Sequence, residues 1–224
     1  MKKININANT LLKLNDWKDM GNTEVTGFFI SEPSDPLTII DAKLIKATCN
    51  PIHVDIDPND MLTFYRKMFE QGIYTNQLNI WWHTHPKMSP TPSCTDYETF
   101  DELNNDRNVG IMFILADDFN YHAEITVKDP ISGISCSENL QMKIFSHPNT
   151  KHEDYETIKK EYEQNVIKEI THWKTKKITY DHQAYDYIYF NNYQDELSCD
   201  QLDRLNDFDD IDEDFSDSKE IFIP

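Results

Sequence analysis

Four side chains with the chemistry of a metal site lie close together near the middle of the sequence. His83 and His85 are separated by one residue, seven residues lie between His85 and Ser93, and Asp96 comes three positions after Ser93. Two imidazoles and a carboxylate are a ligand set that zinc adopts in catalytic sites, where the fourth position is left to water. Water on zinc ionises near neutral pH and attacks a carbonyl carbon. The spacing therefore predicts a zinc site that hydrolyses an amide bond.

The flanking residues predict the elements that would bring these side chains together. Residues 77–82 are largely apolar and aromatic, which is typical of a buried strand leading into the histidines. Because residues two apart on a strand share a face, His83 and His85 would point to one ion. Ser93 would begin a helix in which Asp96 lies beside it. The same pair is equally typical of a simple helix cap, and that alternative remains open at this point.

Hydrolysis also needs a carboxylate that is not a ligand, to take a proton from water and return it to the leaving amine. Spacing alone does not choose among the glutamates of the chain. Glu24 stands out because it opens an apolar strand, predicted over residues 25–30. A solvated strand end is the alternative interpretation of this residue.

Together these features resemble the JAMM (MPN+) family of metalloproteases. The resemblance covers about residues 5–130 and consists of His-x-His-Pro, the later Ser93 and Asp96, and Glu24 in the run Glu-Val-Thr-Gly. It implies that His83, His85 and Asp96 bind Zn²⁺, that Glu24 is the general acid and base, and that Ser93 stabilises the oxyanion. It also implies a cytidine-deaminase-like α/β fold, with a mixed central sheet flanked by helices.

The resemblance implies cleavage of an isopeptide or peptide bond, in a ubiquitin-like conjugate or a peptide precursor, by a stand-alone prokaryotic or phage-type member. Two alternatives stay open: a non-catalytic MPN-like binding or assembly protein, and a RadC-like protein. A zinc deaminase would share the fold, but its sites use a Cys-x-x-Cys pair that this sequence lacks.

Periodicity and turn residues predict further elements around the motif. Asn9 is the expected cap of the first helix, Asp57 caps a second helix that begins at Pro58, and Asp117 and Asp118 form a turn between two strands. The predicted helices cover residues 9–20, 58–71 and 93–103, and the predicted strands cover residues 25–30, 37–48, 109–116 and 121–127.

Three segments are expected along the chain. Residues 1–130 would form the zinc metalloprotease domain, residues 131–193 a C-terminal extension, and residues 194–224 an acidic, flexible tail. Within the extension we expect an irregular connection up to residue 150 and a long amphipathic helix over residues 155–177. The aromatic run at 178–192 would be an edge strand or a docking segment.

Charge and composition limit the partners. The net charge is -19, and the tail carries twelve acidic residues against two basic ones. Nucleic-acid binding needs Lys and Arg against phosphates, so no nucleic-acid partner is expected. The tail is expected to be solvated, and the alternatives are that it binds a basic protein or covers the protein's own cleft. No signal peptide or membrane span is visible, and the four cysteines show no metal-ligand spacing. A cytoplasmic protein that acts on a protein or peptide substrate is expected.

Overall fold

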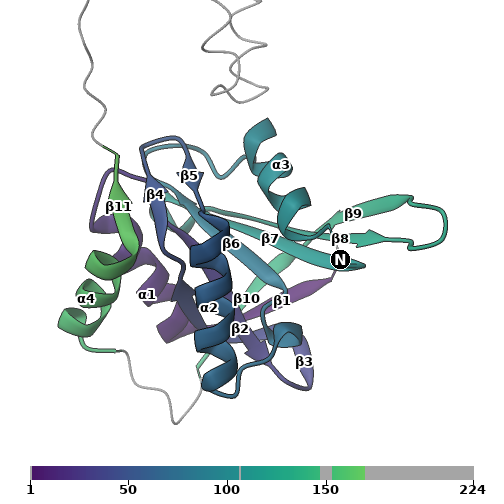
Figure 1. The fold of residues 1–224 in the computed structure, drawn as a ribbon, viewed down its shortest axis with the longest axis horizontal. Coiled ribbons are helices and arrows are strands. Elements are labelled where there is room, and N and C mark those ends of the chain that lie inside the picture. The colour runs from purple at the N-terminus through teal and green to yellow at the C-terminus, as the bar shows by residue number, and fades with distance from the viewer. Residues whose placement is uncertain (1, 106, 147–152, 170–224) are drawn as a thin grey trace, which may run out of the picture.

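A mixed sheet forms the centre of the computed structural model, which describes residues 2–105, 107–146 and 153–169. In these residues the large sheet has eight strands in the order β10-β1-β3-β2-β6-β7-β8-β9, and a small sheet has the order β11-β4-β5. Helices flank the large sheet (Figure 1). The described part of the chain therefore has a mixed α/β fold, as the sequence predicts.

The large sheet contains β1 (Lys3–Asn7), β2 (Thr26–Glu32), β3 (Asp35–Leu44), β6 (Ile80–His85), β7 (Val109–Ala116), β8 (Tyr121–Lys128), β9 (Ser135–Asn139) and β10 (Gln141–Phe145). The small sheet contains β4 (Ala47–Cys49), β5 (Val54–Asp55) and β11 (Val166–Lys168). The helices are α1 (Ala8–Asp19), α2 (Pro58–Glu70), α3 (Cys94–Leu103) and α4 (Tyr155–Asn165), with short 3-10 turns at Thr75–Gln77 and Asp117–Phe119. None of the described helices is long and apolar enough to cross a membrane.

Strand β6 separates two hydrophobic cores. Trp82 points into the core that α1 and α4 cover, where its ring stacks on Trp17 at a centroid distance of 5.6 Å. Trp81 points into the core that α2 and α3 cover, and its ring stacks with Phe100 of α3 at 6.4 Å. Because side chains alternate along a strand, the odd-numbered residues of β6 face α3.

Strand β2 lies directly against β6. The two strands are antiparallel, with Gly27 opposite Trp82, whereas β7 runs parallel to β6 on the other side. A side chain at position 27 would collide with the carbonyl oxygen of Lys43 and the ring of Trp82. Glycine therefore allows β3, β2 and β6 to pack closely, and the residues just before β2 are brought next to the end of β6.

Several predicted elements are confirmed, with shifted ends. The strand before the motif begins at Ile80 and includes both histidines, and Asp57 caps α2 with Pro58 as its first residue. The prediction that Asn9 caps the first helix is wrong. Asn7 is the cap, and its side-chain oxygen accepts a hydrogen bond from the backbone N–H of Asn9 at 3.1 Å.

The prediction of an irregular connection after residue 130 is also wrong. Strand β9 pairs antiparallel with β8, and β10, which follows after Leu140, pairs parallel with β1 at the opposite edge. One bent stretch of chain thus joins the two edges of the sheet. All of the residues of β9 are exposed, so no alternation of apolar and polar residues marked it in the sequence.

The long helix predicted over residues 155–177 is shorter than expected. Helix α4 ends at Asn165, and the next three residues form β11, which pairs parallel with β4. Ile158 and Tyr162 of α4 are buried in the core beneath α1, so this helix packs on the domain. The predictions for residues 170–224, including the aromatic segment and the acidic tail, lie outside the described residues.

Candidate metal centre

The end of β6 carries the two histidines on one face, as predicted. His83 and His85 are both buried, and their Nε2 atoms lie 3.1 Å apart. Thr84 between them points the other way, and its hydroxyl accepts a hydrogen bond from the backbone N–H of Val25 at 3.1 Å. The strand thus presents two imidazoles to one point, and the intervening Thr84 binds the segment that precedes β2.

Helix α3 supplies the carboxylate. Ser93 is its N-cap: the Ser93 hydroxyl oxygen accepts from the Asp96 backbone N–H at 3.1 Å, and the Asp96 carboxylate accepts from the Ser93 backbone N–H at 2.7 Å. The capping interpretation is therefore confirmed. It does not compete with the metal interpretation, since the other oxygen of Asp96, Oδ1, lies 3.1 Å from His83 Nε2. The cap fixes the carboxylate that faces the histidines.

Glu24 lies at the same point, although it is distant in the sequence. The residue lies two positions before the start of β2 and is only 2% exposed, so the interpretation as a solvated strand end is wrong. Its backbone N–H donates to the carbonyl oxygen of Asn50, and the next residue, Val25, accepts a hydrogen bond from the Thr84 N–H. These backbone contacts place the Glu24 carboxylate against β6.

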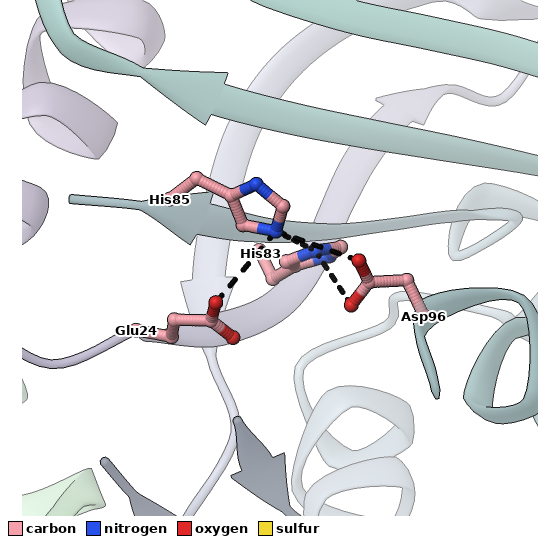
Figure 2. A group of neighbouring side chains, drawn as sticks. All are labelled: Glu24, His83, His85 and Asp96. Atoms are coloured by element: carbon pink, nitrogen blue, oxygen red, sulfur yellow. Dashed lines mark hydrogen bonds and ion pairs between the residues drawn. The ribbon is translucent and has the colours of Figure 1, made fainter. Parts of the chain in front are cut away.

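Figure 2 shows how the four side chains meet, with Glu24 and Asp96 on opposite sides of the histidine pair. The ligand atoms of Glu24, His83, His85 and Asp96 all lie within 4.8 Å of one another. His85 Nε2 is 3.5 Å from Asp96 Oδ2 and 3.6 Å from Glu24 Oε1. Zinc bonds of 2.0–2.1 Å in a tetrahedron require ligand atoms about 3.4 Å apart. The spacings of 3.1 to 3.5 Å among the two histidines and Asp96 fit that requirement.

The tautomer of His85 also suits a metal. Its Nδ1 lies 2.8 Å from the backbone carbonyl oxygen of Ser89. A carbonyl only accepts hydrogen bonds, so Nδ1 carries the proton and Nε2 presents its lone pair to the cluster. Ser89 was missed in the sequence because a backbone carbonyl leaves no residue-specific signal.

Burial and charge give the two carboxylates opposite behaviour. Burial raises the pKa of Glu24 well above its ordinary value, and the nearby Asp96 adds to the rise. Burial also acts to raise the pKa of Asp96, but the His83 imidazole and hydrogen bonds from its neighbours outweigh it and hold the pKa far below the ordinary value. Asp96 is therefore the ionised ligand, and Glu24 is the carboxyl group able to carry a proton.

The donor set fits a divalent cation. Burial lowers the pKa of His83, which favours the neutral imidazole that binds metals. In the described residues no lysine or arginine pairs with either carboxylate of the cluster; their ion-pair partners are the two histidines. Two imidazole nitrogens with carboxylate oxygens are a ligand set typical of zinc. Cys49 lies nearby but is no thiolate ligand, since burial and Glu24 raise its pKa to about 12.

No known protein-family profile matches the chain, and no curated protein sequence matches it. One similar solved structure is the solution structure of protein DSY2949 from Desulfitobacterium hafniense. Its TM-score is 0.45 at 14% identity, over 67% of this chain and 99% of that chain.

Proposed function

We propose that this protein is a zinc-dependent hydrolase of the JAMM type that cleaves an isopeptide or peptide bond. The observation that carries the proposal is the convergence of a fourth, buried carboxyl group, Glu24, on the predicted ligands His83, His85 and Asp96. A purely structural zinc site would close all four positions with protein ligands. We assign His83, His85 and Asp96 as the ligands and Glu24 to proton transfer, because the pKa of Glu24 is raised whereas that of Asp96 is lowered.

Glu24 and Ser93 each have a role in the proposed reaction. Zinc, when bound, would polarise the scissile carbonyl and make a water acidic. The raised pKa of Glu24 suits a group that takes a proton from the attacking water and delivers it to the amine as the C–N bond breaks. The Ser93 hydroxyl oxygen accepts from the Asp96 N–H, so its own hydrogen is free to donate to the developing oxyanion.

The proposed substrate is a ubiquitin-like modifier joined to a lysine, or a peptide precursor. This substrate class rests on the resemblance of the motif to the JAMM family. The mixed α/β fold of the described residues is compatible with the cytidine-deaminase-like fold that the resemblance implies. A non-catalytic MPN-like binding or assembly protein with a vestigial site would purify without stoichiometric zinc.

Glu24→Gln tests the proposal. The glutamine keeps the size of the side chain but cannot take up a proton, so hydrolysis of lysine-linked or linearly fused ubiquitin-like substrates should fall by about 10² to 10⁴-fold. Zinc content, measured by elemental analysis, should stay at the wild-type level. Glu32→Gln, at the far end of strand β2, is the matched control and should change neither quantity. Wild-type turnover in Glu24→Gln would exclude the proposed mechanism.

A further inference from the structure

We infer that Lys18 and Asp117 are positioning residues for the metal centre, because they hold the backbone turn that orients His85. Neither residue belongs to the ligand set, and Asp117 was interpreted from the sequence as a simple turn residue. The inference rests on the proposed metal centre. It concerns how this chain orients one of the ligands, which the motif itself does not specify.

Asp117 lies next to the turn that follows His85 at the end of β6. His85 is in register with Ala116 on the parallel strand β7, so the turn that follows β6 lies beside Asp117. Asp117 Oδ2 accepts a hydrogen bond from the backbone N–H of Lys87 at 3.2 Å. Two residues further on, the carbonyl oxygen of Ser89 receives the Nδ1 proton of His85 at 2.8 Å. The Asp117 carboxylate thus fixes the turn between the ligand His85 and the Ser89 carbonyl group, which sets the tautomer of His85.

The turn needs such a support because its backbone is unusual. Lys87 has a φ of 64°, a left-handed conformation that residues other than glycine rarely adopt. A charge-assisted hydrogen bond to its N–H stabilises this conformation. Without that bond, the segment 86–89 would relax toward commoner conformations and the Ser89 carbonyl would move away from the ring of His85.

Lys18 in turn fixes Asp117. The side chain of Lys18 is only 5% exposed, and its Nζ lies 2.8 Å from Asp117 Oδ1 and 2.6 Å from Asp19 Oδ1. The Asp117 side chain itself is about half exposed, at 49%. A buried ammonium needs carboxylate partners, so Lys18 holds one oxygen of Asp117 while the other faces Lys87. Helix α1 is thereby linked to the metal centre on the far side of β6.

Zinc affinity of the full chain tests this role. Asp117→Asn keeps the shape of the side chain but weakens both interactions. We expect zinc to bind several-fold more weakly in competition with a chelating dye, a smaller loss than the roughly 10- to 100-fold caused by changing a group that contacts a ligand directly. The matched control is Asp118→Asn, the same change one residue later. Asp118 is exposed, and asparagine tolerates its left-handed φ of 56°. Its zinc affinity should equal that of the wild type.

Equal zinc affinities in the two asparagine variants would overturn the inference. Lys18→Met should lower the affinity in the same direction but by less, since Asp117 can still accept from Lys87. Because Lys18 is buried, its loss also affects folding, whereas the half-exposed Asp117 can change without that complication. The spectrum of the cobalt-substituted protein gives a further readout, since an altered His85 geometry shifts its absorption bands and a general loss of stability does not.

A metal-free measurement separates this inference from the proposed function. In chelator-treated wild type, nitrogen-15 NMR of the histidine rings should show His85 with its proton on Nδ1. In Asp117→Asn it should show a mixture of tautomers and faster exchange of the Lys87 amide. If the wild type binds no zinc, the proposed metal centre fails, while this result still decides whether Asp117 orients His85. An unchanged tautomer and unchanged exchange in Asp117→Asn would overturn the role.

Discussion

In the described part of the chain, the cluster around the buried Lys13 and the metal centre balance their charges in different ways. Between α1, β3 and α4, the Lys13 ammonium lies 3.2 Å from Asp41, 3.1 Å from Glu153 and 3.7 Å from Glu161. Lys43 adds a second cation, 2.9 Å from Asp41. At the end of β6, by contrast, the ion-pair partners of Glu24 and Asp96 among the described residues are the two histidines.

The difference appears in the pKa values of Asp41 and Glu24. Burial acts to raise the pKa of both Asp41 and Glu24. At Asp41 the neighbouring Lys13 and Lys43 outweigh burial, and the pKa is lowered. At Glu24 the neighbouring charge is another carboxylate, and the pKa is raised. A buried cluster that contains its own cations is complete as a structural unit. A buried cluster that lacks one is a candidate site for a cation and for proton transfer.

The strongest test of this comparison is the metal content of two variants. His83→Ala removes one of three ligands and should abolish zinc binding, a loss greater than about 100-fold, since changes to residues behind the ligands already cost 10- to 100-fold. Lys13→Met alters the other cluster and should leave about one zinc per chain. Elemental analysis after dialysis measures both. Zinc retained in His83→Ala, or lost in folded Lys13→Met, would break the distinction between the clusters.

The second prediction concerns stability. Removing Lys13 leaves Asp41 with Lys43 as its cation, but Glu153 and Glu161 lose theirs. Because these carboxylates are partly exposed, Lys13→Met should lower the free energy of unfolding by about 1 to 2 kcal/mol, less than the loss for a fully buried pair. Lys159→Met on α4 is the control. Its ammonium is 4.0 Å from Glu163 in an exposed pair, and such pairs contribute only a few tenths of a kcal/mol. Urea titration followed by circular dichroism compares the two, and equal midpoints would show that the Lys13 cluster is not structural.

The local part of the metal centre could be predicted from the sequence because its geometry is local. A strand places His83 and His85 on one face, and a helix start places Ser93 beside Asp96, so short-range periodicity was sufficient. Glu24 was selected only by its context before an apolar strand and by the family resemblance. What places it is the pairing of β2 with β6, a contact between residues distant in the chain.

The wrong predictions have a common cause, which is contact between residues that are distant in the sequence. Strand β9 is exposed throughout, and its partner β8 decides its conformation. The apolar periodicity of α4 continues past Asn165 in the sequence, but pairing with β4 converts the next residues into β11. Asp117 has the composition of an ordinary turn, and its contact with Lys18 spans 99 positions. Local propensity does not contain such information, and tertiary contacts override it.

The smallest expected effect is a difference in the pH dependence of stability in metal-free protein. The pKa of Glu24 is raised above its ordinary value of 4.5, so its ionisation opposes folding as the pH rises. Glu24→Gln should therefore match wild type at low pH and become increasingly more stable than wild type above about pH 4.5. Denaturant titrations at several pH values in the presence of a chelator measure this gap.

Asp41→Asn should show the opposite sign in the same experiment. Because the pKa of Asp41 is lowered from 3.8, its ionised form stabilises the fold above that pH, and this contribution is lost as the pH falls. The asparagine variant should therefore be less stable than wild type at neutral pH and approach it in acid. Slopes of the same sign in the two variants would contradict the proposed difference, in which neighbouring cations lower the pKa of Asp41 and a neighbouring carboxylate adds to the rise at Glu24.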